Sequence, residues 1–237
     1  MAQGPSQFVS KEEKEAHVQG MFDAIAPRYD LLNRVIAVNM DQRWRRRAAK
    51  AARGTGHGPY IDVGAGTGDL TRALMREAPA ARILALDLAR NMLREGKRKG
   101  GEEFQAVQGS GLALPVPDDS IEGMTNAFVL RNLADLDAFF REAYRALRPG
   151  GRLVSLEISR PHGRVFGPLY RVYFFRVMPR IGRILSGNKR AYDYLADSVA
   201  RVADPEELVA MMRAAGFARV DAQPLMRGAV QLFVAEK

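Results

Sequence analysis

The stretch Ile61-Asp62-Val63-Gly64-Ala65-Gly66-Thr67-Gly68-Asp69 decides the fold. An apolar strand runs into glycines, and a helical pattern follows from Leu70. Glycines at this junction let the backbone turn tightly and approach a ligand, and the helix that follows supplies free N–H groups. We therefore expect a cofactor to lie across this turn, with Asp62, Gly64 and Gly66 among the residues that bind it.

Strands and helices alternate on the carboxyl side of this turn. Strands are expected at 83–86, 104–107, 121–128 and 152–158, and helices at 70–77 and 139–147. Near the end, Asp204-Pro205-Glu206-Glu207 is typical of a helix start, and Gly216 is typical of a helix stop. Two closing strands, at 217–222 and 229–235, have no helical pattern between them, so we expect them to pair antiparallel.

This alternation predicts an α/β fold with a doubly wound sheet of seven strands, mostly parallel with an antiparallel last strand, plus N-terminal helices. A chain of 237 residues fits one domain. Within it we expect four parts: an N-terminal helical cap (1–53), a cofactor-binding core (58–160), a helical insertion that faces substrate or membrane (161–203), and a C-terminal helix with strands (204–237).

Two helices are expected in the N-terminal cap. The first is amphipathic and needs a partner surface, because apolar residues recur at the spacing of one helix face. These residues are Val18, Met21, Phe22 and Ile25. The second, over 41–53, carries the basic residues Arg43, Arg46, Arg47 and Lys50. Such a face is typical of a solvated helix side, with anionic lipid headgroups or nucleic acid as alternative partners.

The composition excludes several kinds of site. The absence of cysteine excludes disulfides, thiolate nucleophiles and Cys-ligated metal. The three histidines are scattered without the spacing of a metal site, so we predict no metal. Lys and Arg (36) exceed Asp and Glu (27), and this net charge of +9 attracts nucleic acid or an anionic membrane surface. No stretch resembles a signal peptide or membrane span, so we expect a cytoplasmic protein, peripheral at the inner face of the membrane.

The sequence of the glycine turn favours a cofactor with a single nucleoside over a dinucleotide cofactor. The dinucleotide fingerprint places a small residue where Asp69 stands, and a carboxylate there would oppose a pyrophosphate. Asp87 ends the second expected strand, 25 positions after Asp62. A carboxylate at such a strand end can accept both hydroxyls of a ribose. We therefore expect Asp87 to bind the cofactor.

Two stretches resemble the class I S-adenosylmethionine-dependent methyltransferase superfamily: the turn at 62–68 and Leu147-Arg148-Pro149-Gly150-Gly151. The resemblance covers residues 58–160 and implies a Rossmann-like fold with S-adenosylmethionine as cofactor. It implies cofactor contacts at Thr67, at Asp87 and in the loop Gly109-Ser110-Gly111. Many members place an Asp in that loop to hold the adenine amino group. This chain has none there, which leaves the Ser110 hydroxyl and backbone groups.

The flanking segments resemble the demethylmenaquinone and polyprenyl-benzoquinol C-methyltransferase family over nearly the whole chain. The matching segments are 21–26, Tyr29-Asp30, Asn33, 126–132 (Asn-Ala-Phe-Val-Leu-Arg-Asn), 173–179, 186–188 and 191–195. The resemblance implies transfer of a methyl group to a prenylated quinol in menaquinone or ubiquinone biosynthesis. The short stretch before the glycine turn favours demethylmenaquinol over 2-methoxy-6-polyprenyl-1,4-benzoquinol as acceptor.

Methylation at a ring carbon requires phenolate character in the quinol. A phenol with a pKa near 10 is ionised about one part in a thousand at neutral pH, a deficit of roughly 4 kcal/mol. A neighbouring cation lowers such a pKa by about 1 to 3 pH units. Arg131, after the fourth strand, is the expected cation, although it could form an ordinary salt bridge instead. Asn132 is expected to orient the quinol and Tyr29 to act as a hydrogen-bonding lid.

The segment 169–185 interleaves aromatic residues with arginines. It is too charged to span a bilayer, so it predicts an amphipathic helix that lies at the membrane interface or packs its aromatics beside the active site.

Two other functions stay open. The charge permits a nucleic-acid methyltransferase, but the Asn- or Asp-Pro-Pro-aromatic motif of base-methylating enzymes is absent after the fourth strand, and we expect no nucleic-acid partner. A non-catalytic module is disfavoured by the intact glycine turn with Asp87. A homo-oligomer remains open.

Overall fold

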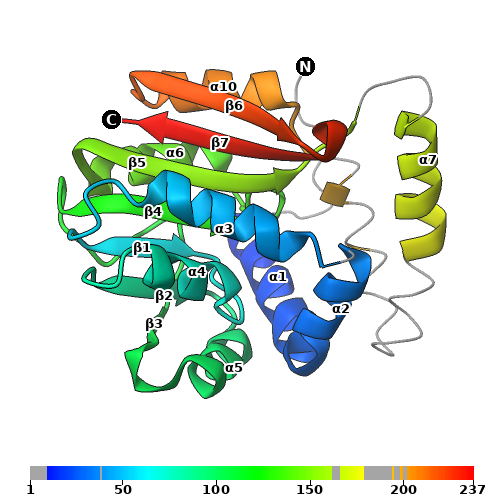
Figure 1. The fold of residues 1–237 in the computed structure, drawn as a ribbon, viewed down its shortest axis with the longest axis horizontal. Helices are drawn as coiled ribbons and strands as arrows, with labels where there is room; N and C mark the ends of the chain where they lie inside the picture. The colour runs from blue at the N-terminus through cyan, green and yellow to red at the C-terminus, as the bar shows by residue number, and fades with distance from the viewer. Residues whose placement is uncertain (1–9, 38, 162–165, 179–193, 195–197, 200–201) are drawn as a thin grey trace.

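In the computed structural model, seven strands form one sheet in the order β3-β2-β1-β4-β5-β7-β6 (Figure 1). The structure describes residues 10–37, 39–161, 166–178, 194, 198–199 and 202–237. The strands are β1 (Tyr60–Val63), β2 (Ile83–Asp87), β3 (Gln105–Gln108), β4 (Ile121–Ala127), β5 (Leu147–Ile158), β6 (Arg219–Leu225) and β7 (Val230–Glu236).

The strand directions confirm the predicted fold class. Strand β1 pairs in parallel with β2 and β4, and the parallel pairing extends to β3 on one side and β5 on the other. Strand β7 runs antiparallel to both neighbours, β5 and β6. Because carboxyl ends of parallel strands meet at one edge, the loops after β1, β2, β3 and β4 lie together, and a ligand in such a sheet binds there.

Helices cover both faces of the sheet. One core packs α3 (Asp41–Ala52) and α4 (Asp69–Glu77) against the central strands, and the other packs α6 (Leu136–Ala146) and α10 (Pro205–Ala214). The fully buried Phe139 and Phe140 of α6 anchor the second core. Helix α10 begins as predicted, with a capping box in which the Asp204 N–H donates to the Glu207 carboxylate at 3.0 Å.

Helix α1 (Lys11–Ile25) finds the surface that its apolar face requires at the carboxyl edge of the sheet. Its Val18 is buried. Lys11 Nζ lies 2.6 Å from the Asp135 carboxylate, and Lys14 Nζ donates to the Leu133 carbonyl at 2.5 Å. At the other end, the Asn91 N–H of α5 (Arg90–Gly100) donates to Asp23 at 2.7 Å. Helix α1 is thus fastened at both ends.

The structure differs from the predicted elements in three places. The 29–33 stretch, for which no helix is predicted, belongs to helix α2 (Tyr29–Ile36), which follows the 3-10 turn η1 (Ala26–Arg28). Helix α5 is not among the predicted elements. Strand β5 begins at Leu147 instead of residue 152, because Leu147 pairs with Ile121 and the Gly150 N–H donates to the Lys237 carbonyl at 2.8 Å.

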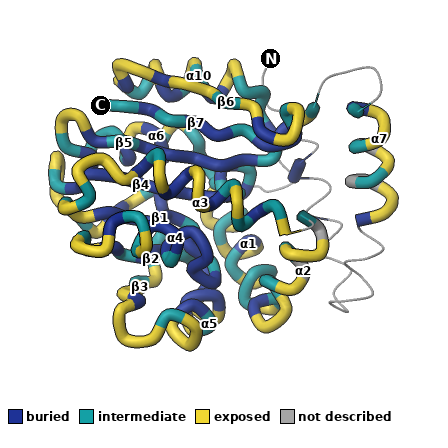
Figure 2. The backbone as a smooth tube through the Cα atoms, viewed as in Figure 1, coloured by how far each residue is buried: buried dark blue, intermediate teal, exposed yellow. Residues whose placement is uncertain are grey.

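The expected basic face of α3 is exposed at all four positions, and Figure 2 shows this helix exposed along its outer side. Helix α7 (Phe166–Val172) and the π turn η4 (Tyr173–Val177) are helical as predicted, whereas 179–185 lie outside the described residues. The family-like segments 186–188 and 191–195 also lie outside them, except Tyr194. Within the described part of the chain, no helix is long and apolar enough to cross a membrane.

The remaining short turns are η2 (Gly101–Glu103), η3 (Leu130–Asn132) and η5 (Met226–Gly228). Of these, η3 is functionally placed, because it follows β4 at the carboxyl edge of the sheet and carries two predicted acceptor-site residues, Arg131 and Asn132.

Candidate active site

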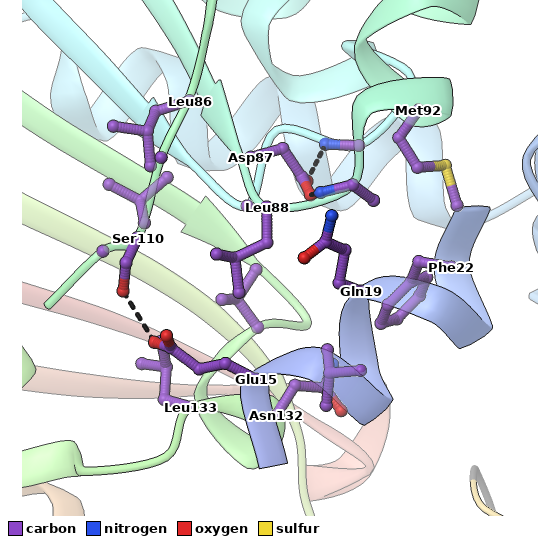
Figure 3. Close-up of a pocket in the computed structure, with 18 of the residues that line it drawn as sticks. Glu15, Gln19, Phe22, Leu86, Asp87, Leu88, Met92, Ser110, Asn132 and Leu133 are labelled. Carbon is purple, nitrogen blue, oxygen red and sulfur yellow. Dashed lines mark hydrogen bonds between the residues drawn. The ribbon is translucent and has the colours of Figure 1, made fainter. Parts of the chain in front are cut away.

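A pocket lies under α1 at the carboxyl edge of the sheet (Figure 3). It encloses about 680 Å³ when the solvent-filled space at its open mouth is included. It brings together seven of the ten predicted site residues: Gly64, Gly66, Asp87, Ser110, Gly111, Tyr29 and Asn132. The other three, Asp62, Thr67 and Arg131, do not line it.

The glycine turn after β1 forms part of the pocket wall. Gly64 and Gly66 have φ angles of +64° and +57°, which glycine adopts without strain. A Cβ on Gly64 would lie 2.5 Å from Val129 Cγ2, so this glycine permits close packing. A Cβ on Gly66 would meet nothing nearer than Tyr29 Cε1 at 3.8 Å. The backbone at Gly66 therefore faces open space, as a turn that holds a cofactor requires.

Asp87 lies at the end of β2 with its carboxylate held by the backbone. One oxygen accepts the Gly66 N–H at 2.7 Å, and the other accepts the Ala89 N–H at 2.8 Å. Burial raises the pKa of Asp87 to about 6, although these backbone hydrogen bonds oppose the rise. Each oxygen keeps a lone pair, so the carboxylate can accept the two hydroxyls of a ribose. This residue fits the nucleoside part of S-adenosylmethionine.

Asp62 supports the turn from below the pocket. Its carboxylate is 1% exposed and accepts hydrogen bonds from Thr71 Oγ1 at 2.6 Å and Thr125 Oγ1 at 2.8 Å. Burial raises the pKa of Asp62 to about 6, against the effect of both hydroxyls. These contacts tie β1 to α4 and β4. The Asp62 carboxylate therefore influences ligand binding indirectly, because it supports the glycine turn.

Thr67 also acts behind the wall. Its buried hydroxyl donates to the Asp30 carboxylate of α2, which also receives the ammonium group of Lys99 from α5. The hydroxyl is thus engaged by another helix, and the contact fixes the position of α2 relative to the glycine turn.

The loop after β3 meets α1. Ser110 Oγ accepts the Leu112 N–H at 3.1 Å and donates to Glu15 Oε1 at 2.7 Å. Gly111 packs closely, since a Cβ there would lie 2.7 Å from Val63 Cγ1. Figure 3 shows Glu15 and Gln19 reaching from α1 toward the sheet edge. Both line the pocket beside the predicted residues.

Asn132 and Tyr29 also line the pocket, Asn132 after β4 and Tyr29 beside the glycine turn. The Asn132 amide donates to the Phe128 carbonyl at 3.3 Å and accepts from the Tyr194 hydroxyl at 3.3 Å. Phe128 has a φ of +64°, a conformation that a bulky residue rarely adopts. The Tyr29 ring packs edge-on against Phe22 with centroids 5.9 Å apart. Tyr29 thus supplies an aromatic group beside the glycine turn, and Asn132 supplies a polar group at the end of the pocket near β4.

Arg131 lies behind this end of the pocket, in a buried ion pair. Its Nη1 lies 2.6 Å from Glu157 Oε1 and 2.6 Å from the Phe128 carbonyl, and the two charged side chains are 6% and 1% exposed. Its Nε is buried and has no hydrogen-bond partner among the described residues. Burial raises the pKa of the Tyr170 phenol on α7, and the positive charge of Arg131 opposes that rise.

Sequence reasoning missed four residues of this region: Glu15, Gln19, Glu157 and Tyr194. Glu15 and Gln19 lie one turn apart on the helix face that carries Val18, but a pattern search for apolar periodicity passes over polar positions. Glu157 lies near the carboxyl end of β5, where polar side chains of this fold gather, so its position was a usable signal. The buried Tyr194 gave no local signal.

Comparison with known proteins identifies relatives over nearly the whole chain. The model of the ubiE/COQ5 methyltransferase family matches residues 9–237. A demethylmenaquinone methyltransferase of Deinococcus radiodurans is 43% identical over 96% of this chain and 95% of the relative. Another protein of that name, from Thermus thermophilus, is 47% identical over 83% of this chain and 91% of the relative.

Solved structures show a similar fold. The crystal structure of a SAM-dependent methyltransferase from Aquifex aeolicus is similar with a TM-score of 0.54 and 18% identity, over 76% of this chain and 82% of that one. At this identity the likeness concerns the fold alone, the Rossmann-like methyltransferase fold that the sequence predicts.

Proposed function

Because this chain belongs to the ubiE/COQ5 methyltransferase family, we propose that it transfers the methyl group of S-adenosylmethionine to a ring carbon of a prenylated quinol, with demethylmenaquinol as acceptor. The enzyme is an S-adenosylmethionine-dependent methyltransferase. The observation that carries the proposal is that one pocket is lined both by Asp87 at the end of β2 and by Asn132 after β4. Both lie within the matched residues 9–237.

The residues at the glycine turn would hold the cofactor, which when bound supplies an electrophilic methyl group on a sulfonium centre. Asp87 would accept the ribose hydroxyls, and the open backbone at Gly66 and the Ser110-Gly111 loop would complete the cradle. This cradle forms from backbone groups that the sheet fixes before any ligand arrives. A preorganised site of this kind lowers the entropic part of the barrier, because the donor is held in one position.

The residues near β4 would act on the acceptor. Asn132 lines the pocket and orients the quinol oxygen, while Tyr29 covers the ring from α2. Arg131 lies behind the wall, so its charge lowers the pKa of the quinol through the field and not by direct contact. The buried Arg131 Nε has no hydrogen-bond partner among the described residues, so a water molecule can link it to the quinol oxygen. Glu157 holds the guanidinium in place.

We propose further that the enzyme collects its prenylated substrate from a lipid surface. Large apolar side chains are exposed on α2, α7, η4 and η5, namely Leu31, Val35, Leu169, Val172, Val177 and Met226. The exposed basic face of α3 would add attraction to anionic headgroups.

Vesicle sedimentation tests this proposal. The combined change Leu169→Gln and Val172→Gln should reduce binding to vesicles that contain anionic lipid, whereas Arg213→Gln on α10 should not. If the Leu169/Val172 double variant binds these vesicles as well as Arg213→Gln does, the proposal that the enzyme collects its substrate from a lipid surface is contradicted. The oligomeric state is a separate question. Analytical ultracentrifugation of the protein without vesicles measures whether it forms a homo-oligomer.

The acceptor is tested with pure protein, labelled S-adenosylmethionine and reduced quinols that differ in ring and tail. We expect methyl transfer to demethylnaphthoquinols, with higher kcat/KM when a prenyl tail is present. A preference for 2-methoxy-6-polyprenyl-1,4-benzoquinol would move the acceptor to ubiquinone biosynthesis. Saturable transfer to bulk RNA, with none to either quinol, would overturn the proposal.

A further inference from the structure

Two polar side chains of helix α1 lie over the pocket. Glu15 meets Ser110 of the loop after β3, and Gln19, one turn later, points in the direction of Asp87 at the end of β2 (Figure 3). Val18, between them, is buried and fixes the rotation of the helix. Glu15 and Gln19 therefore face two neighbouring parts of the pocket, the loop after β3 and the end of β2.

The Glu15 carboxylate is held in place through one oxygen, and its other oxygen keeps its capacity to accept a hydrogen bond. Oε1 accepts the Ser110 hydroxyl at 2.7 Å, and the Leu112 N–H at 3.1 Å fixes the direction of that hydroxyl. Among the described residues, no hydrogen bond or ion pair engages Oε2, so this oxygen is available as an acceptor. Glu15 is half-buried, and part of it faces the pocket.

The strand order decides which part of the cofactor lies near Glu15. The order β3-β2-β1-β4 places the glycine turn after β1, Asp87 after β2 and Ser110 after β3 in sequence along the edge. With the ribose on Asp87 and the acceptor site beyond β4, the base attached to the ribose extends toward β3. Leu86 and Leu88, at the end of β2, supply an apolar lining suited to a flat ring.

We infer that Glu15 selects the base of the cofactor by accepting a hydrogen bond from the exocyclic amino group of adenine. The loop 109–112 carries no carboxylate of its own, so the acceptor comes from α1. A keto oxygen in place of the amino group would face the negative Oε2 without a proton between them, and the site would reject it. The inference rests on the proposed function only in that the enzyme binds an adenosyl cofactor.

Calorimetry with two product-like ligands tests this role without turnover. S-adenosylhomocysteine carries the amino group, and S-inosylhomocysteine carries a keto oxygen at the same position. We expect the wild type to prefer the adenosyl ligand by at least about tenfold. In Glu15→Gln the amide can donate to the keto oxygen, so the preference should fall to within about threefold. Glu12→Gln, the same change at an exposed position of α1, should keep the wild-type preference.

The ratio of the two affinities separates selection from support. If Glu15→Gln weakens both ligands equally, Glu15 only stabilises α1 and the inference is overturned, and it is equally overturned if the ratio is unchanged. If the wild type binds neither ligand, the cofactor assignment fails and the proposed function fails with it. Thermal unfolding of Glu15→Gln and Glu12→Gln shows whether both variants are folded at the temperature of the titration.

Discussion

The two ends of the pocket differ in what supplies their polar groups. At the β1–β2 end, backbone N–H groups of Gly66 and Ala89 hold the Asp87 carboxylate. At the β4 end, side chains hold one another, as in the contact of Asn132 with Tyr194 and of Arg131 with Glu157. A backbone-built site is fixed by the sheet and is insensitive to its neighbours. A side-chain-built site depends on residues from distant parts of the chain, so its parts should fail together.

The largest expected effect is at the side-chain end. Arg131→Ala should lower kcat by about a hundredfold to a thousandfold, because the quinol loses its cation, while the Kd for S-adenosylmethionine stays within about threefold. It also leaves Glu157 as an uncompensated buried carboxylate and should destabilise the fold by about 3 to 5 kcal/mol. Single-turnover kinetics, calorimetry and thermal unfolding measure these effects. Arg141→Ala, at an exposed position of α6, is the charge-matched control.

The double variant Arg131→Met with Glu157→Met sharpens this test, because it removes both charges and relieves the buried carboxylate. We expect it to recover stability but not activity. Recovery of activity as well would show that Arg131→Ala fails through folding alone, and would remove Arg131 from the mechanism.

The next effect is at the backbone end. Asp87→Asn should raise the Kd for S-adenosylmethionine by about tenfold to a hundredfold, because the amide NH₂ faces a backbone N–H and cannot accept a ribose hydroxyl. The kcat at saturating cofactor should change little, since the acceptor end is built separately. Asp118→Asn, 74% exposed, controls for the lost charge. A large fall in kcat at saturation would show that the two ends are coupled.

Cofactor affinity should also depend on pH through Asp87. Its pKa is raised to about 6, so the carboxylate that we propose as the ribose acceptor is ionised above that pH and becomes protonated as the pH falls through it. Calorimetry should show Kd rising about tenfold between pH 7 and pH 5. The free energy of unfolding responds in the opposite sense, because a raised carboxyl pKa favours the folded state below the unfolded value of 3.8. A profile equally steep in Asp87→Asn would assign the effect to another group.

The smallest effect is expected at Asp62, which has the same raised pKa but a different position. Asp62→Asn should change the Kd for S-adenosylmethionine by less than about threefold, because its carboxylate contacts only threonine hydroxyls. Stability at pH 7 should change by less than about 1 kcal/mol, since lost hydrogen bonds and relieved desolvation offset each other. A tenfold loss of affinity would restore Asp62 as a direct ligand.

The fold and the backbone end of the pocket could be predicted from the sequence because their signals are local. The glycine turn and Asp87 each follow a strand, and the helix start at Asp204 is complete within four residues. Helix α2 was missed because Pro27 suggested that the preceding helix simply ends, while the chain continues through η1 into a new helix.

The side-chain end could be predicted only in part, because its contacts join distant segments. The position of Arg131 after β4 is a local fact, but its pairing with Glu157 depends on the parallel alignment of β4 with β5. The contact between Glu15 and Ser110 spans 95 positions, and no local pattern announces it. Long-range contacts among polar side chains carry no periodicity, so a single sequence does not reveal them.

Because ion pairs help to hold α1 over the pocket, ionic strength should affect how fast the product nucleoside leaves. The sheet below is held by hydrogen-bonded strands, whereas one end of the helix above is held by the exposed Lys11 and its partner Asp135. Such pairs are weak and are screened by dissolved ions. Raising ionic strength should therefore speed the departure of the spent nucleoside more than it slows its capture, and stopped-flow dissociation rates would record the difference.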